Sequence, residues 1–183
     1  MQAVIANLAY RALICEVEAT PKPGLVDRAN NGAHKDMDLA LFYKSAESLR
    51  PYFTEITVCG LATAEEPIQT RLPAVRPMGM AAERAMFAAT NGVNTHKGAI
   101  FTLGILCFAA GRAAALGEAL VPDTICRLAA DMCHGVEREL TAGTAGTKGE
   151  RAYAAYGITG IRGEAARGFP SVRAYALPSL MRR

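Results

Sequence analysis

The sequence predicts an all-α fold, a single-domain multi-helix bundle with functional loops between the helices. Three observations predict it: alanine is abundant, β-branched residues are sparse, and apolar residues recur every three or four positions through most of the chain. The 183 residues fall within the usual range for one domain, and 51% hydrophobic residues supply a sizeable core. We therefore expect residues 1–183 to form one helical domain.

The first two expected helices are separated by a long polar loop. The first helix runs from about residue 2 to residue 18, and the prolines at positions 21 and 23 stop it. Its expected inward face comprises Ile5, Leu8, Ala12 and Leu13. After the loop, Asp36 or Asp38 is a candidate N-cap for the second helix. The expected apolar stripe of this helix comprises Leu39, Phe42, Ala46 and Leu49, with Pro51 ending the helix.

Further helices are expected along the rest of the chain. A third covers roughly residues 54–64, and a fourth begins near Pro77, since prolines crowd the segment that precedes it. The apolar residues 97–116 predict a buried core helix, because the longest uncharged run is well short of the roughly 20 residues that a bilayer-spanning helix needs. Another helix is expected from Asp123, a candidate N-cap, to about Leu140.

The segment TAGTAGTKG is predicted to be a flexible loop. It is not a Walker phosphate loop, because the GxxxxGK[ST] order is absent and no strand precedes it.

Composition excludes several classes of function. Twenty basic and seventeen acidic residues give a net charge of +3, which offers no reason to expect a nucleic-acid partner or an anionic membrane. The five cysteines form no CxxC pair and lie mostly in apolar helical segments, so free buried thiols are expected. The first twenty residues lack the pattern of a signal peptide. We therefore expect a cytoplasmic protein that binds anions only locally.

Three polar clusters beside glycines are candidate functional segments, because loops on a helical scaffold commonly carry function. The first cluster comprises Lys22, Asp27, Arg28, Asn30, Asn31, His34, Lys35 and Asp36. For Asp27 and Asp36, helix capping or turn chemistry is an equal alternative. His34 and the later His96 could ligate a transition metal, but no HExxH or Cys/His spacing supports zinc. Carboxylates that hold magnesium on a polyphosphate fit the composition better.

The second cluster runs from Asn91 to Gly98 and places Asn94, Thr95, His96 and Lys97 at the expected start of the apolar helix. Unpaired backbone N–H groups and the helix dipole make such a position receptive to phosphate, and capping by Asn94 or Thr95 is compatible with that role.

The third cluster comprises Glu150, Arg151, Tyr156, Arg162, Glu164, Arg167 and Arg173, for which a solvated charged face is the favoured alternative. Glu83 is a lone carboxylate on a largely apolar helix, and periodicity leaves open whether it is exposed or belongs to a site.

Four segments, taken in order, resemble the triphosphoribosyl-dephospho-coenzyme A synthases, which serve citrate lyase and, in close relatives, malonate decarboxylase. The segments are EVEATPKPGLVDRANNGAHKDMD, RPMGMAAERAMF, GVNTHKGAIFTLGILCFAAGR and GERAYAAYGITGIRGEAARGFPSVRAYALP. The resemblance covers nearly the whole chain.

The resemblance implies an all-helical fold, a divalent cation, expected to be Mg²⁺, and ATP and 3′-dephospho-coenzyme A as substrates. In the implied reaction the 2′-hydroxyl of dephospho-coenzyme A attacks the ribose anomeric carbon of ATP. Adenine leaves and the triphosphate stays attached. The product is the precursor of a prosthetic group, which a second transferase passes to the acyl carrier protein of citrate lyase or malonate decarboxylase.

Two departures from the family pattern stand out. Some relatives have an acidic residue where this chain has Ala85, so that carboxylate is not essential if the chain is active. Family members also continue beyond Arg183 through segments with Asp-Thr-Asn and Arg-Gly-Gly patterns. We therefore expect this chain to be the N-terminal portion of the family's domain. Apolar surface that the missing segment would cover favours self-association into a homo-oligomer.

The implied reaction assigns roles to the clusters. Its oxocarbenium-like state calls for carboxylates, and the candidates are Asp27, Asp36, Glu83 and Glu164. The triphosphate calls for cations, and the candidates are Lys22, Lys35, Lys97, Arg28, Arg151 and Arg162. Hydrogen bonding to the departing adenine could come from His34, His96 or Asn94. The remaining expected substrate-binding residues are Asn31 and Thr95.

Within this set we hypothesise Asp36 or Glu83 as base or magnesium ligand, His96 as leaving-group donor, and Lys35 and Lys97 as triphosphate contacts. Two other classes of function stay open. A catalytically incomplete nucleotide-binding fragment would bind ATP or dephospho-coenzyme A without releasing adenine. A magnesium-dependent nucleotide hydrolase would release phosphate and would not need coenzyme A.

Overall fold

Every regular element in the described residues, 1–139 and 148–181 of this computed structural model, is a helix, and these residues contain no strand. The predicted all-α single-domain fold is confirmed. The α-helices are α1 (Gln2–Glu18), α2 (Leu39–Ser48), α3 (Arg50–Ala62), α4 (Arg71–Ala89), α5 (Lys97–Ala115), α6 (Pro122–Met132), α8 (Lys148–Tyr156), α9 (Gly160–Ala166) and α10 (Leu177–Met181). Short helical turns are η1 (Ile68–Thr70), η2 (Val136–Arg138) and the π-helical η3 (Val172–Ala176).

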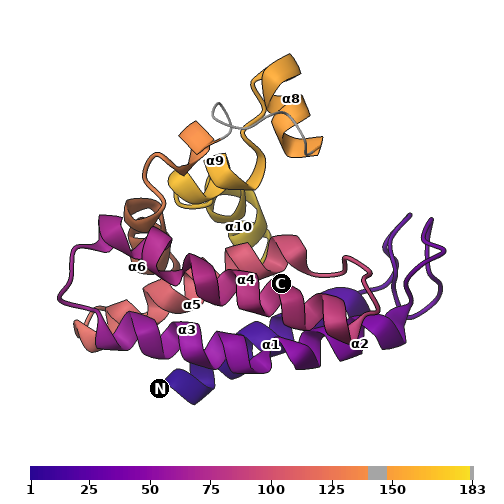
Figure 1. Cartoon of the computed structure of the whole chain (residues 1–183), viewed down its shortest axis with the longest axis horizontal. Coiled ribbons are helices and arrows are strands. Elements are labelled where there is room, and N and C mark those ends of the chain that lie inside the picture. The colour runs from indigo at the N-terminus through magenta and orange to yellow at the C-terminus, as the bar shows by residue number, and fades with distance from the viewer. Residues whose placement is uncertain (140–147, 182–183) are drawn as a thin grey trace.

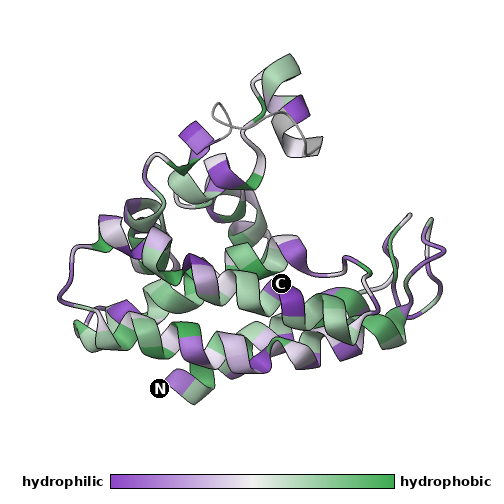
Figure 2. Cartoon of the chain, viewed as in Figure 1, coloured by the Kyte–Doolittle hydropathy of each residue, from purple (hydrophilic) through white to green (hydrophobic). Residues whose placement is uncertain are grey.

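The centre of the molecule is α5, which contacts α1, α3, α4, α6 and α9. Its sequence is apolar on all sides, and Ile100, Phe108, Ala109 and Ala113 are almost completely buried. By length and hydropathy α5 could cross a membrane, but 56% of its apolar stretch is buried inside the protein. The expectation of a buried core helix is therefore confirmed. Figure 1 shows the long helices α1–α5 packed together, and Figure 2 shows hydrophobic residues running along them.

Glycines allow the backbones of α3 and α5 to approach closely. A Cβ atom added to Gly60 would overlap the carbonyl oxygen of Phe108, and one added to Gly111 would overlap the carbonyl oxygen of Thr57. Phe108 and Thr57 are themselves completely buried. The pair α3–α5 therefore packs main chain against main chain, at a separation that no larger residue allows at these positions.

The buried face of α1 differs from the predicted one. It comprises Ile5, Ala6, Ala9, Leu13 and Val17. Leu8 is 59% exposed and Ala12 is also exposed, so both predictions were wrong. At about 100° per residue, Leu8 lies roughly a third of a turn away from the centre of this face. Several apolar faces were available along this alanine-rich helix, and the packing of α3 and α5 selected one of them.

The boundaries of α2 and α3 shift from the expected ones. Of the two candidate caps, Asp38 holds the N-cap position of α2, and its carboxylate accepts a hydrogen bond from the Leu41 N–H at 2.8 Å. Leu49 and Ala46 are buried as predicted. Helix α2 ends at Ser48, before Pro51. Pro51 lies in the first turn of α3, where the missing N–H has no helical partner to lose.

Helix α4 begins at Arg71, six residues before the predicted start at Pro77. Pro73 lies in the first turn, where its lack of an N–H is tolerated. Pro77 lies inside the helix and removes one backbone hydrogen bond, to the carbonyl of residue 73. The helix continues because Val75, before the proline, and Met86, after it, are both buried in the core.

Helix α6 also departs from expectation at both ends. Val121 holds its N-cap position, and Asp123 lies in the first turn, where it pairs with Arg173 at 2.6 Å instead of capping. The helix ends at Met132, before Gly135, whose φ of 78° breaks helical geometry. The predicted end at Leu140 and most of the predicted loop TAGTAGTKG lie outside the described residues, and the last two residues of that loop open α8.

All five cysteines are free. Cys107, Cys126 and Cys133 are buried, as the apolar spacing predicted. Cys15 is exposed, so the expectation was wrong there, because it lies on the solvent side of α1.

We expect Gly111→Ala to destabilise the protein by about 1–3 kcal/mol, because its Cβ would overlap the α3 backbone and the two helices would have to move apart. Urea unfolding measures the change. Gly98→Ala is the matched control, since an added Cβ meets nothing within 4 Å there, and its stability should equal or slightly exceed that of the wild type. Equal stability of both variants would contradict the close α3–α5 contact.

Candidate functional site

A cleft of about 480 Å³ lies between α4, the first half of α5, and the segments around η2 and α9. One face of α4 supplies residues spaced by three and four positions, from Leu72 through Arg76 and Met80 to Glu83. The apolar lining comprises Leu72, Val75, Met80, Ile100, Phe101, Ile105, Val136, Ile158 and Ile161. The charged lining residues are Arg76, Glu83, Lys97, Glu139 and Arg162. The cleft therefore combines an apolar wall with ionised groups.

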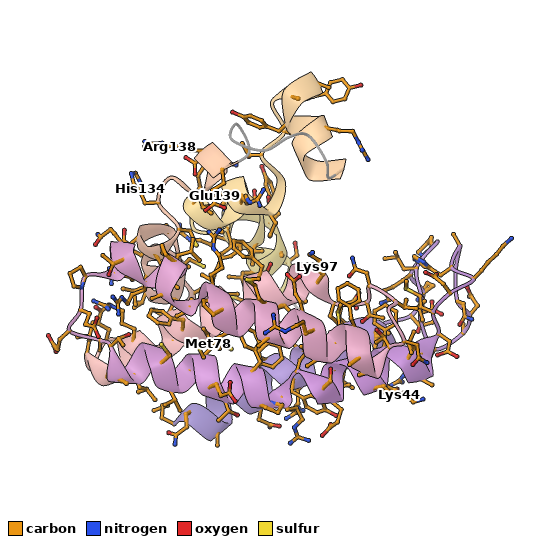
Figure 3. The ribbon with its side chains drawn as sticks, viewed as in Figure 1. Lys44, Met78, Lys97, His134, Arg138 and Glu139 are labelled. Atoms are coloured by element: carbon orange, nitrogen blue, oxygen red, sulfur yellow. The ribbon has the colours of Figure 1, made fainter. Side chains whose placement is uncertain are left out.

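The charged groups of the cleft form two separate ion-paired sets. The Lys97 Nζ lies 3.1 Å from Glu83 Oε2, and these side chains are 53% and 33% exposed. Glu139 pairs with two arginines: its Oε1 lies 2.5 Å from Arg76 Nη2, and its Oε2 lies 3.9 Å from Arg162 Nε. Figure 3 shows Lys97 at the start of α5 and Glu139 beside α9. Ion pairs this exposed contribute little stability, so an anionic ligand can compete for the three cations.

The loop before α5 explains why Lys97 reaches the cleft. The chain leaves α4 through Asn91 and Gly92, both with positive φ, and the Thr90 hydroxyl lies 2.6 Å from the Val93 carbonyl. The Asn94 side chain then accepts the Lys97 N–H at 3.3 Å, so Asn94 serves as a cap, the alternative that its position allowed. Of the predicted second cluster, Lys97 and Gly98 line the cleft, whereas Asn94, Thr95 and His96 do not.

His96 points into the protein instead of lining the cleft. It is 5% exposed, its Nδ1 lies 2.7 Å from Ser45 Oγ, and its ring stands against Phe42 at 5.1 Å, edge to face. Thr95 Oγ1 donates to Ser45 Oγ at 2.6 Å. Burial lowers the pKa of His96 to about 4, so the imidazole is neutral at neutral pH. Its Nε2 is buried and has no hydrogen-bond partner among the described residues.

Asp27 organises the first loop. Its carboxylate accepts hydrogen bonds from the backbone N–H groups of Lys22 at 2.9 Å, Ala29 at 2.7 Å and Asn30 at 3.0 Å. These donors hold the pKa of Asp27 below its usual range. The geometry matches the turn-chemistry alternative, and Asp27 acts here by shaping the loop.

Two cations of the first loop, Lys22 and Arg28, are tied to the end of α1. Lys22 Nζ donates to the Glu16 carbonyl at 2.7 Å and to its carboxylate at 2.8 Å. Arg28 Nη2 lies 2.5 Å from Glu18 Oε2, and the Tyr43 hydroxyl of α2 donates to the other oxygen of this carboxylate, Oε1, at 2.7 Å. These hydrogen bonds from Tyr43 and Arg28 lower the pKa of Glu18. None of these three partners, Glu16, Glu18 and Tyr43, could be predicted from the sequence, because a glutamate near a helix end and a lone tyrosine have no distinctive pattern.

The rest of the first cluster lies on the outer part of the loop, which projects from the helices (Figure 1). His34 Nδ1 lies 3.8 Å from Asp36 Oδ1, and Lys35 and Asn31 are exposed. None of these residues lines the cleft, so Asp36 does not join Glu83 there. Within the described ranges, no three His, Cys, Asp or Glu side chains gather as a metal site.

The third cluster is dispersed. Arg162 alone lines the cleft. Glu164 accepts the Ser171 N–H at 3.2 Å and its hydroxyl at 2.9 Å, which secures the turn into η3. Arg151 and Tyr156 are exposed on α8. The Arg167 side chain is exposed, Arg173 pairs with Asp123, and the Glu150 side chain lies outside what the structure describes. The solvated-face alternative describes most of this cluster.

Two charged cleft residues, Arg76 and Glu139, were not predicted. A signal for Arg76 existed, because it precedes Glu83 by seven positions and therefore shares its helix face. Nothing in the local sequence marks Glu139, which reaches the cleft only through the tertiary fold.

Comparison with known proteins identifies related sequences. A family model described as CitG, ATP:dephospho-CoA triphosphoribosyl transferase, matches residues 2–183. A probable 2-(5″-triphosphoribosyl)-3′-dephosphocoenzyme-A synthase of Pectobacterium carotovorum subsp. carotovorum is 53% identical over 171 residues. A synthase of the same name from Pectobacterium atrosepticum is 51% identical over 171 residues. Each match covers 92% of this chain and 57% of the relative, so the chain spans little more than half their length. No solved structure matches significantly.

We expect Asp27→Asn to destabilise the protein at neutral pH, because an amide cannot replace a carboxylate that accepts three N–H groups. Since the folded pKa is lowered, this stabilisation is present above the unfolded pKa and is lost as pH falls through the folded pKa. The difference in urea midpoint between variant and wild type should therefore shrink in acid. The exposed Asp36→Asn serves as control, and a difference that stays constant with pH would contradict this role.

Burial of His96 also predicts a pH dependence of stability. Its pKa falls from about 6.5 unfolded to about 4 folded, so the unfolded state binds more protons between these values. This residue should cost about 1.4 kcal/mol of stability per pH unit as pH falls through that window, about 3 kcal/mol in total. In urea unfolding, His96→Gln should remove this slope, whereas the exposed His134→Gln should keep it. The same slope in both variants would contradict burial of a neutral His96.

Proposed function

Because the chain belongs to the ATP:dephospho-CoA triphosphoribosyl transferase family, we propose that it transfers the triphosphoribosyl group of ATP to the 2′-hydroxyl of 3′-dephospho-coenzyme A, releasing adenine. The observation that carries the proposal is the family match over residues 2–183, together with relatives at 53% and 51% identity that are named as synthases of this product. The product would be the prosthetic-group precursor of citrate lyase or malonate decarboxylase.

The cleft supports this proposal through its charges. Both substrates are polyanions, and Lys97, Arg76 and Arg162 supply three cations that are paired only through exposed contacts. Lys97 also sits at the first position of a 19-residue helix, where the dipole adds positive potential. We assign Lys97 to the triphosphate, with the arginines as further phosphate ligands.

The carboxylates of the cleft suit the chemistry at the sugar. As the bond between the anomeric carbon and adenine breaks, its electron pair goes to adenine and positive charge develops on the ribose. The attacking 2′-oxygen forms the new bond and loses its proton. Glu83 lines the cleft and is held by Lys97, so we propose that it accepts this proton and stabilises the developing charge. The proton finally balances the charge on adenine.

The first loop and the loop before α5 would complete the site. Lys35 and Asp36 are exposed on the projecting loop and His34 is partly exposed, so these side chains could meet the second nucleotide. His96, neutral and buried, would serve as a hydrogen-bond donor to the departing adenine.

We propose that Mg²⁺ binds at this site together with the phosphates of the nucleotide. Mg²⁺ usually keeps waters and binds substrate phosphates with only one or two carboxylates, and the cleft offers two, Glu83 and Glu139. When bound, the ion would neutralise triphosphate charge. Asp36 lies on the outer loop and does not line the cleft, so it would contact the ion only if the loop moved toward the cleft. A cytoplasmic location, self-association and transfer of the product to a second transferase complete the proposal.

Lys97→Ala should lower the rate of adenine release by about 10- to 100-fold, because a charged contact to the triphosphate is lost. The assay supplies ATP, Mg²⁺ and dephospho-coenzyme A and identifies the product by mass. Lys44→Ala is the control: this lysine is exposed on α2, points outward in Figure 3, and should be dispensable. An unchanged rate for Lys97→Ala would remove its assigned role.

The same assay separates the competing functions. A product that carries the triphosphoribosyl mass supports the synthase. Nucleotide binding without adenine release would indicate a catalytically incomplete fragment, and phosphate release without coenzyme A would indicate a hydrolase; either outcome would overturn the proposal for this chain.

A further inference from the structure

The side chain of Tyr52 brings a hydroxyl group to the cleft from α3. Tyr52 is 8% exposed and is part of the cleft lining. Its hydroxyl lies between α4 and α5, where α5 has no side chain because the residue there is Gly104. A Cβ atom at Gly104 would overlap the hydroxyl oxygen. A polar oxygen therefore lies within the apolar wall of the cleft.

The single hydrogen of the Tyr52 hydroxyl is already used. The hydroxyl donates to the Ile100 carbonyl at 3.2 Å, and the direction is fixed because a carbonyl oxygen only accepts. Burial raises the pKa of Tyr52, with smaller contributions from Cys107 and Glu83, so the phenol keeps this hydrogen at neutral pH. Among the described residues, no group donates to the hydroxyl oxygen. Toward the cleft the hydroxyl can therefore act only as an acceptor.

Gly79 of α4 leaves this oxygen uncovered on the cleft side. Gly79 lines the cleft, and a Cβ atom added to it would lie 3.8 Å from the Tyr52 hydroxyl oxygen, in ordinary van der Waals contact. A longer side chain at this position would cover the oxygen. Gly79 also precedes Glu83 by four residues, which is about 6 Å along the helix. The acceptor therefore lies about one helical turn from the carboxylate proposed to act at the ribose.

We propose that Tyr52 is a specificity-determining residue that accepts a hydrogen bond from the exocyclic amino group of the adenine of ATP, with Gly79 leaving room for the base. The inference rests on the proposed function, which places the ribose at Glu83 and the triphosphate at Lys97. The base is attached to the same ribose, so it meets the next turn of α4. The contact uses only the amino group and leaves the ring nitrogens of adenine free to form other hydrogen bonds.

The group at position 6 of the purine determines the selection. Adenine has an amino group there, which is an N–H donor, whereas a 6-oxopurine such as hypoxanthine has a carbonyl oxygen. That carbonyl would face the Tyr52 oxygen with no hydrogen between the two. A site that pairs one polar group of a ligand discriminates against an analogue that leaves this site group unpaired. Met80 and Phe101 of the lining contact the apolar faces of either base, so they contribute affinity without discrimination.

Calorimetric titration of the whole chain in Mg²⁺ with ATP, inosine triphosphate and tripolyphosphate separates these contributions. The wild type should bind ATP about 10-fold more tightly than inosine triphosphate. Tyr52→Phe should weaken ATP binding by about the same factor, without weakening the binding of inosine triphosphate or of tripolyphosphate, which has no base. The variant should fold, because the Ile100 carbonyl keeps its helical hydrogen bond within α5.

Gly79→Leu is a second test that leaves Tyr52 in place. The leucine side chain covers the hydroxyl oxygen and fills the space of the base, so ATP should bind about 10-fold or more weakly. Tripolyphosphate should bind as it does to the wild type. Ala81→Leu is the matched control, because Ala81 is exposed on the same helix and does not line the cleft, and it should bind all three ligands normally.

Three results would overturn the proposal. The first is a wild type that binds ATP and inosine triphosphate equally or binds neither. The second is Tyr52→Phe that leaves ATP binding unchanged or weakens both nucleotides by the same factor. The third is a loss in Tyr52→Phe confined to dephospho-coenzyme A, because the adenine of that substrate would then be the partner.

Failure of the proposed function gives a different result. A chain that prefers ATP through Tyr52 but releases no adenine would count against the transfer reaction and leave the base assignment intact. A chain that releases adenine from ATP and hypoxanthine from inosine triphosphate at equal rates would keep the transfer reaction and count against Tyr52.

Discussion

The close contact between α3 and α5 is the constraint on which the rest of the structure depends. Gly60 and Gly111 let the two backbones meet, and this places Phe108 and Ile56 in a core without exposed surface. Burying each large apolar side chain stabilises the fold by about 1.5–3 kcal/mol. With α5 held in the centre, its first turn reaches the surface, where Lys97 and Gly98 are exposed. Lys97 is presented to the cleft for that reason.

The polar parts of the molecule are attached to this core by a few specific contacts. Glu18 joins Arg28 of the first loop to Tyr43 of α2, and Ser45 of α2 joins the loop before α5 through Thr95 and His96. Helix α2 therefore links the two loops that contain the densest motifs. A change in one loop can therefore reach the other through a single short helix.

Much of the fold could be predicted from the sequence because its signals are local. The apolar run after Lys97 predicted the buried α5, and Asp38 was one of two expected caps of α2. Errors arose where local rules compete with tertiary packing. Pro77 by itself predicts a helix break, yet α4 continues past it because Val75 before it and Met86 after it are buried in the core. Leu8 is apolar but lies on the exposed side of α1.

The sequence by itself determined the helical class, the positions of the polar loops and the family resemblance, because composition, periodicity and motif order are properties of the chain alone. Only the tertiary structure decided which predicted residues share a site. It brought Glu83, Lys97 and Arg162 to one cleft, added Arg76 and Glu139, and turned His96 inward onto Ser45. These groupings depend on contacts between residues far apart in the chain, and no local spacing encodes such contacts.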